Sequence, residues 1–395
     1  MSGGRVGFCL SDKKRKRMNL DAFAVFCEGH GVDVVQIDLT RPLVHQGPFD
    51  VIVHKLSDVI VEAEQDSQSQ QLLANFQSYV SAHPATVLLD PLPAMTRLLD
   101  RFASYRIMSE LRESLRDWSI CSPPYLEIHR ASEPPSIQQA MMTQGVSFPL
   151  ICKTRVAHGS LSHEMSLIFS GGGLEDIRPP CVLQSFVNHG AVLHKVFVVG
   201  DRHFCVERPS LKNFPSGACG QSATDRKTIF FNSHEVSKPE SNSDLTALDG
   251  QTASRAPPSS EAVAALVGEL RVQLGMALFG VDLIISIHTH TLTVIDINIF
   301  PGTAAGGGGG TVTDPVACTD MSSPLLSQAT REFPSSSPPC SATSSPCWTN
   351  ARQEEVHLLL QPASESPSSA SGAVKSPPLA SSPVCWDQNS RRRFH

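Results

Sequence analysis

Short apolar runs alternate with helical patterns along the first hundred residues of the chain. The apolar runs at 32–39 and 49–56 are rich in strand-forming residues, whereas the helical segments repeat apolar residues every three or four positions. This alternation predicts a parallel sheet with helices on its faces. The predicted strands are 5–10, 32–39, 49–56 and 86–90, and the predicted helices are 19–31, 70–83 and 94–111.

A proline-rich junction at 121–136 separates this part from a second one with different patterning. Two alternating runs around Gly200-Asp201 predict a hairpin over 191–209, and a second hairpin is predicted over 279–300. Residues 237–260 are polar and predict a surface insertion. Further strands are predicted at 148–155, 165–170 and 181–187, with a turn at 171–177 and a helix over 261–280.

The composition changes after Gly302, where five consecutive glycines lead into a Ser- and Pro-rich end. From Met321 to His395, 28 of 75 residues are Ser or Pro, so this segment buries too little apolar surface to offset its ordering entropy. We therefore expect a disordered tail. The predicted domains are 1–112, 113–302 and the divergent tail 303–395.

The net charge and the cysteine content indicate which kinds of binding partner and which cellular compartment suit this chain. The net charge is −6, so no overall positive field attracts nucleic acid or a membrane surface. The chain has neither an apolar run of about 18 residues nor a signal-peptide pattern. Its 11 cysteines form no CxxC pair, which is typical of a reduced protein. We expect a cytoplasmic monomer that binds neither nucleic acid nor membrane.

The motif "DIN" in the last predicted hairpin is a candidate metal site. Asp296 and Asn298 lie two residues apart on a strand and therefore share a face, and Asp282 is on the neighbouring strand. Two carboxylates and an amide offer only oxygen ligands, which suit a hard cation such as Mg²⁺. The alternative is that all three are ordinary surface residues of a hairpin.

Several cations are candidates for binding phosphate. Lys153 ends an apolar strand, where its ammonium could reach a nucleotide phosphate or extend to solvent from the sheet edge. The basic run "SDKKRKRMN" at 11–19 follows the first strand, at a place where α/β proteins bind ligands. The same run also fits a nuclear localisation signal or a solvated basic face.

Residues 5–302 closely resemble the inositol-tetrakisphosphate 1-kinase family, also described as inositol 1,3,4-trisphosphate 5/6-kinases. The resemblance is carried by "LSDKKRKRMNLDAF", "KTRVAHG", "RPSLKNF" and "VIDINIFPG". It implies an α/β ATP-grasp fold with an N-terminal Rossmann-like parallel-sheet domain. It also implies an ATP-dependent kinase that uses Mg²⁺, with two ions expected, and acts on soluble inositol tris- and tetrakisphosphates.

The resemblance also implies roles for particular residues of this chain. It places Lys153, His163 and Lys195 at the catalytic centre, and His158 and Gly159 in a segment over the active site. The implied ATP contacts are Arg101, Lys153, Gln184, Ser185, Phe186, Val187, Asn188, Lys195, Ser210, Ser233 and Ser237. The implied substrate contacts are Lys14, Lys55, His163, Lys195, Asn298 and Gly302, and the implied metal ligands are Asp282, Asp296 and Asn298.

Two alternatives to an active inositol phosphate kinase stay open at this point. An ATP-grasp carboxylate–amine ligase would use the same metal residues, although it would rarely need so many contacts to anions. The other alternative is an impaired or inactive isoform, because the family continues after "FPG" with a C-terminal helix where this chain has Thr303 and a glycine run.

Overall fold

The structure is a computed structural model that describes residues 4–11, 15, 20–215, 227–238, 240–241, 243–246 and 257–299. All of the described residues belong to one compact unit of the chain. Lys14, Gly302, half of the polar insertion and the predicted tail lie outside the described residues. No helix among the described residues has the length and apolar character needed to cross a membrane.

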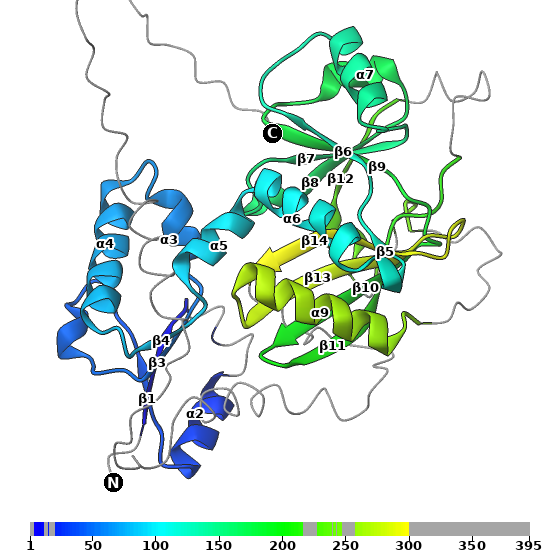
Figure 1. Ribbon diagram of the computed structural model, residues 1–395. Helices are drawn as coiled ribbons and strands as arrows, with labels where there is room; N and C mark the ends of the chain where they lie inside the picture. Colours follow the sequence, from blue (N-terminus) through cyan, green and yellow to red (C-terminus); the bar gives the residue numbers. More distant parts are fainter. Residues whose placement is uncertain are drawn as a thin grey trace, which may run out of the picture. The chain divides into compact units, whose positions relative to one another are not determined.

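The N-terminal part forms the predicted parallel sheet, with strand order β2-β1-β3-β4 (Figure 1). Val6 and Phe8 of β1 pack against Phe23 of α2, whereas Cys9 joins a cluster with Phe76 of α4, so each face of the sheet has its own core. These elements are β1 (Arg5–Cys9), α2 (Leu20–Gly29), β2 (Asp33–Gln36), β3 (Val51–His54), α3 (Ser57–Glu62), α4 (Ser67–Ala82) and β4 (Val87–Leu89), with a 3₁₀ turn at Leu43–His45.

The single helix predicted over 94–111 is wrong, because the structure has two helices there. α5 (Leu92–Leu99) ends before Asp100, and α6 (Arg101–Ser114) begins directly after it. Asp100 has extended backbone angles, and its Oδ1 accepts a hydrogen bond of 2.9 Å from the Phe102 amide. The aspartate thus caps α6, and the break makes Arg101 the first residue of that helix.

The second half builds two five-stranded sheets, ordered β11-β10-β13-β14-β5 and β12-β8-β7-β9-β6 (Figure 1). Both predicted hairpins are confirmed as antiparallel pairs, β10 with β11 and β13 with β14. The strands are β5 (Ile120–Cys121), β6 (Tyr125–Ile128), β7 (Leu150–Thr154), β8 (Glu164–Ile168), β9 (Cys181–Ser185), β10 (Val192–Val199), β11 (Arg202–Pro209), β12 (Ile229–Asn232), β13 (Leu278–Ile285) and β14 (Leu292–Ile299).

Short helices and one long helix complete this half. The predicted helix over 261–280 is too long, because α9 (Ser260–Leu274) ends at Gly275, whose φ of 63° is the left-handed conformation that terminates helices. The apolar residues that follow belong to β13. The remaining helices are α7 (Pro134–Thr143) and α8 (Ser233–Val236), with 3₁₀ turns η2 (Arg116–Trp118), η3 (Ser160–His163) and η4 (Gly171–Asp176).

The largest core joins α6 and α9 to the sheet that contains β10, β13 and β14. Tyr105 from α6, Leu270 from α9 and Phe279 from β13 belong to this cluster and are at most 1% exposed. Burial of one such side chain contributes about 2 kcal/mol or more, so this core fixes α6 and the central strands relative to each other.

Asp90 joins the N-terminal sheet to the five-stranded sheet that contains β13. Its carboxylate follows β4, is 2% exposed, and accepts hydrogen bonds from the amides of Ala277 (2.7 Å) and Leu278 (2.8 Å) at the start of β13. Burial raises the pKa of Asp90 to about 6, although the two amide hydrogen bonds act in the opposite direction.

Replacing Asp90 by Ala should destabilise the protein by about 2 kcal/mol, because two buried amides lose their acceptor. Asp90→Asn should destabilise the protein less, because the side-chain oxygen of Asn still accepts one of the two hydrogen bonds. Urea unfolding at pH 7.5 measures both, with exposed Asp117→Ala as the matched control. Equal unfolding free energies for the Asp90→Ala and Asp117→Ala proteins would contradict this account.

Candidate active site

Three charged side chains form a row across neighbouring strands. The strand register sets Lys195 of β10 opposite Asp282 of β13, and Asp282 opposite Asp296 of β14. Lys195 Nζ lies 2.8 Å from Asp282 Oδ1 and 3.0 Å from Oδ2. The row therefore brings together two predicted metal ligands and a predicted phosphate contact.

A β-bulge beside this row provides an acceptor for Lys153. The register changes from Asp282 opposite Asp296 to Leu283 opposite Val294, so Ile295 is the extra residue on β14. Lys153 comes from β7 of the other sheet, and its Nζ donates a 2.9 Å hydrogen bond to the Ile295 carbonyl. Through the bulge, β14 of one sheet thus accepts a hydrogen bond from Lys153, which lies on β7 of the other sheet.

Lys153 is a buried cation and not an exposed lysine at a sheet edge. It is 5% exposed, and its Nζ lies 5.4 Å from the centroid of the Tyr105 ring. Burial lowers the pKa of Lys153 to about 8, although Asp296 acts in the opposite direction. The side chain is still mostly protonated at neutral pH and brings a positive charge to the site.

Arg101 adds a second buried cation from the start of α6. Its guanidinium donates hydrogen bonds to the carbonyls of Thr154 (2.9 Å) and Ser162 (3.2 Å), and Nη2 lies 3.7 Å from Asp296 Oδ2. At 4% exposure, the guanidinium is held by both ends of the segment between β7 and β8. The break at Asp100 is therefore what brings Arg101 to the charged row.

Asp296 is stabilised as a carboxylate by this surrounding charge. Burial raises its pKa, but the positive charges of Lys153, Arg101 and Lys195 outweigh that effect, and the pKa lies below its usual value. Three cations thus surround the two carboxylates Asp282 and Asp296. Within the described cluster this leaves an excess of positive charge, which favours an anionic ligand.

The donor set of Asp282, Asp296 and Asn298 fits a hard cation. Asn298 is exposed, two residues beyond Asp296 on the same strand, and lies opposite Gly280. No group of three or more His, Cys, Asp or Glu side chains with metal-site geometry occurs among the described residues. A bound ion would therefore need further oxygens, from water or from phosphate, which is how proteins commonly hold Mg²⁺.

Residues 184–188, which the family resemblance implies as ATP contacts and which we expect to bind the adenine base, are shaped by hydrogen bonds of their own side chains. The Tyr105 hydroxyl donates to Gln184 Oε1, and Ser185 Oγ accepts from the Ser147 amide at 3.0 Å. Asn188 exchanges two hydrogen bonds with the backbone of Phe214, at 2.7 and 2.8 Å. These side chains act within the protein fold, so an adenine contact would fall to other atoms of the segment.

An aromatic group lies beside this segment. The ring of Phe214 packs edge-on against those of Phe186 and Phe169, with both centroid separations 5.4 Å. Ser210 Oγ lies 2.7 Å from Nε2 of His189, a buried residue just after the segment. Val187 accepts a hydrogen bond from the same imidazole through its carbonyl, at 2.7 Å.

The remaining predicted contacts lie on other short segments of the chain. His163 ends η3 and is exposed, Ser233 begins α8, and Ser237 follows the end of α8. Lys55 directly follows β3. His158 Nε2 lies 2.6 Å from Asp58 Oδ1 in the first turn of α3, which links the segment after β7 to the N-terminal part.

Family models match most of the described chain. Residues 5–95 match the inositol 1,3,4-trisphosphate 5/6-kinase pre-ATP-grasp domain, and residues 114–308 match the ATP-grasp domain of the same kinases.

The chain belongs to the inositol 1,3,4-trisphosphate 5/6-kinase family.

Curated relatives in this kinase family are similar over the same region. The chain is 51% identical over 303 residues to inositol-tetrakisphosphate 1-kinase of Xenopus laevis, covering 76% of this chain and 75% of that one. The protein of the same name from Danio rerio is 49% identical over 303 residues, with the same coverage. Inositol-tetrakisphosphate 1-kinase 3 of Oryza sativa is 38% identical over 298 residues, covering 75% of this chain and 77% of the other.

A distant solved structure has a similar fold. The crystal structure of D-cycloserine synthetase DcsG matches with a TM-score of 0.51 and 12% identity, over 84% of this chain and all of that one. At this identity the likeness concerns the fold alone. It confirms the fold class implied by the kinase-family resemblance.

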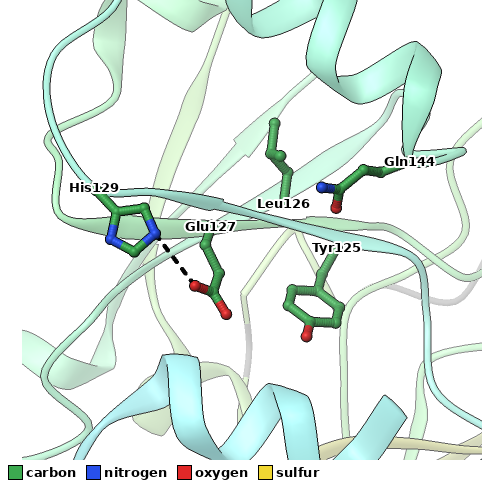
Figure 2. Close-up of a pocket in the computed structure, with 5 residues that line it drawn as sticks. All are labelled: Tyr125, Leu126, Glu127, His129 and Gln144. Carbon is green, nitrogen blue, oxygen red and sulfur yellow. Dashed lines mark ion pairs between the residues drawn. The ribbon is translucent and has the colours of Figure 1, made fainter.

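A separate pocket of about 250 Å³ lies along β6 (Figure 2). Glu127 there accepts two hydrogen bonds from Arg106, at 2.9 and 2.7 Å, and lies 3.3 Å from His129 Nε2. Because Glu127 is neutralised by these neighbours, the pocket does not resemble the cation-rich row. Its lining residues are Tyr125, Leu126, Glu127, His129 and Gln144, which are not among the predicted site residues.

Asp296→Asn should lower the free energy of unfolding by about 3 kcal/mol at pH 7, because it leaves buried cations without their carboxylate. The folded pKa of Asp296 is lowered, so its contribution is present above the unfolded carboxyl pKa of about 3.9 and is lost as the pH falls through the folded value.

Urea unfolding between pH 7 and pH 3 measures this difference. The gap between the wild-type and Asp296→Asn proteins should shrink as the pH falls below about 4, whereas exposed Asp117→Asn should show little difference throughout. A gap that is constant with pH would show that Asp296 is not held as a carboxylate by its neighbours.

Proposed function

We propose that the chain is an ATP-dependent kinase that phosphorylates soluble inositol polyphosphates. The main support is the convergence of Lys153, Arg101 and Lys195 on the two carboxylates Asp282 and Asp296. A nucleotide triphosphate and an inositol polyphosphate both carry dense negative charge, so bringing them together requires local cations in a protein whose net charge is −6.

The proposed substrates are inositol 1,3,4-trisphosphate, phosphorylated at the 5- or 6-position as in the names of the matching family models, and an inositol tetrakisphosphate, phosphorylated at the 1-position as in the names of the relatives. That the tetrakisphosphate is the 3,4,5,6 isomer is proposed from the family resemblance alone. A carboxylate–amine ligase is disfavoured, because the family models and relatives in the comparisons are named as inositol phosphate kinases. We further propose that the enzyme works in the cytoplasm as a monomer, with domains 1–112 and 113–302.

Phosphoryl transfer needs alignment and neutralisation of charge more than covalent help. Lys153 and Arg101 are proposed to hold the ATP phosphates, since both are buried and approach the row from different elements. Asp282, Asp296 and Asn298 would hold Mg²⁺, with two ions expected. When bound, the metal supplies positive charge to the phosphate oxygens.

The inositol phosphate is proposed to bind where the two halves of the chain supply cations. The predicted contacts are Lys14, Lys55, His163, Lys195, Asn298 and Gly302. Each hydrogen bond between a charged donor and a phosphate contributes about 1.5–3 kcal/mol, so a few such contacts suffice to orient a ring hydroxyl. Lys195 is proposed to serve both ligands, and Lys153, His163 and Lys195 form the proposed catalytic group.

The base of ATP is proposed to lie along residues 184–188. The predicted contacts in that segment are Gln184, Ser185, Phe186, Val187 and Asn188, and the further ones are Ser210, Ser233 and Ser237. Since the side chains of Gln184, Ser185 and Asn188 hydrogen-bond within the protein, we propose that backbone atoms contact the adenine edge. Phe186 and its aromatic neighbours offer an apolar surface to the base.

An assay with γ-labelled ATP and either inositol phosphate tests the proposed function. The wild-type chain should transfer label to the ring, and Asp296→Ala should reduce kcat/KM about 100-fold or more through loss of a metal ligand. Asp117→Ala is the control, and a cooperative melting transition confirms that each variant folds. Equal turnover by the wild-type and Asp296→Ala proteins would refute the assigned role, and no turnover by a folded wild type would refute the function.

The dependence of kcat/KM for ATP on pH tests Lys153 separately. Burial lowers the pKa of this lysine to about 8, so the cation is present below that pH and is lost above it. We expect kcat/KM for ATP to fall as the pH rises through about 8, because this quantity reports groups of the free enzyme. Lys153→Arg should flatten the profile on that side, whereas a wild-type profile that is level from pH 7 to pH 10 would contradict the role.

A further inference from the structure

Two histidines from separate segments pack against each other beside the charged row. The rings of His163, at the end of η3, and His234, in α8, are stacked with centroids 5.1 Å apart and an interplanar angle of 29°. His163 is among the predicted substrate contacts, but no sequence feature pointed to His234. Both side chains are exposed, so the stack is not part of a hydrophobic core.

The strand register produces this stack. β12 pairs antiparallel with β8, and Asn232 lies opposite Glu164. His163 directly precedes Glu164, and the chain that leaves Asn232 turns at once into α8. The turn therefore carries His234 back across the end of β8 to the imidazole of His163.

Asn232 fixes both sides of this arrangement. Its Nδ2 donates a 2.6 Å hydrogen bond to Glu164 Oε1, next to His163 in the chain. Its Oδ1 accepts from the amides of His234 (2.9 Å) and Glu235 (3.3 Å) and thereby caps α8. One side chain thus ties the backbone of His234 to the strand that follows His163.

The stack also lies within the electrostatic influence of the charged row. Burial lowers the pKa of His163, and His234 and Arg101 lower it further. Asp296 acts in the opposite direction, and Lys195 also lowers it. The groups that act on the His163 imidazole therefore come from α8, α6, β14 and β10, and the ring of His234 from α8 is stacked on it.

We propose that His234 is a positioning residue, whose ring packs flat against His163 and holds that imidazole in the orientation that meets the inositol phosphate. The inference rests on the proposed function for the role of His163, but the packing itself does not. A free histidine at the end of a short turn would sample several rotamers, whereas a stacked ring restricts them. His234 acts through His163 and needs no contact with substrate.

Steady-state kinetics with inositol 1,3,4-trisphosphate test this role. His234→Ala should raise KM for the inositol phosphate about five-fold, the loss expected for one aromatic contact, and should also lower kcat, because His163 belongs to the proposed catalytic group. His234→Phe keeps a flat ring and should restore KM. His288→Ala, at an exposed position in the β13–β14 turn, is the matched control.

A double-mutant cycle separates positioning from a merely structural effect. In a His163→Ala background, His234→Ala should change KM no further, because the residue through which it acts is gone. The same increase of KM in both backgrounds would overturn the proposal, as would an unchanged KM in the single His234→Ala variant.

Titration of the His163 imidazole by NMR gives a readout that does not need turnover. Its pKa should rise in His234→Ala and rise less in His234→Phe, since phenylalanine still covers one face of the His163 ring but removes the neighbouring imidazole. If the wild type transfers no phosphate, the proposed function fails and this titration still decides the packing. If transfer is normal and the titration is the same in all three proteins, the positioning role fails alone.

Discussion

Buried charge must be paired, and this constraint organises the centre of the molecule. Lys153 and Arg101 are at most 5% exposed, and an isolated buried cation would cost several kcal/mol. The two carboxylates on β13 and β14, the carbonyl of Ile295 and the carbonyls around Arg101 offset that cost. Elements from both sheets and from α6 must therefore meet at one place, which is the candidate active site.

The bulge at Ile295 is the local feature that allows β7 of one sheet to contact β14 of the other. In a regular ladder the Ile295 carbonyl would lie within the β13–β14 pairing, whereas the bulge lets it accept from Lys153 of the other sheet. The same change of register leaves Asp282 and Asp296 directly opposite each other. The extra residue Ile295 thus links the two sheets through Lys153, and the register around it places the carboxylates of Asp282 and Asp296 opposite each other.

Much of the architecture could be predicted from local patterns, because strand and helix periodicity depend on neighbouring residues. The parallel sheet and both hairpins follow from alternation and turn residues, and the shared face of Asp296 and Asn298 follows from strand geometry. The break at Asp100 was missed because the apolar spacing continues through it and the capping residue resembles any helical aspartate.

Contacts between distant segments could not be predicted in this way. The bulge at Ile295, the contact of His158 with Asp58 and the stack of His163 on His234 each depend on a register or a turn that no local pattern encodes. The ligands, which are ATP, Mg²⁺ and inositol phosphates, were instead indicated by the resemblance of the sequence to the kinase family. The structure adds the physical reason, a cluster in which cations outnumber the carboxylates they surround.

The central claim is that the carboxylate pair on β13 and β14 holds the metal that serves phosphoryl transfer. The most direct measurement is anomalous diffraction from crystals grown with Mn²⁺, a non-hydrolysable ATP analogue and inositol 3,4,5,6-tetrakisphosphate. The account predicts an anomalous peak between the carboxylates of Asp282 and Asp296, next to the nucleotide phosphates. Nucleotide bound with Mn²⁺ at a place that neither carboxylate contacts would contradict it.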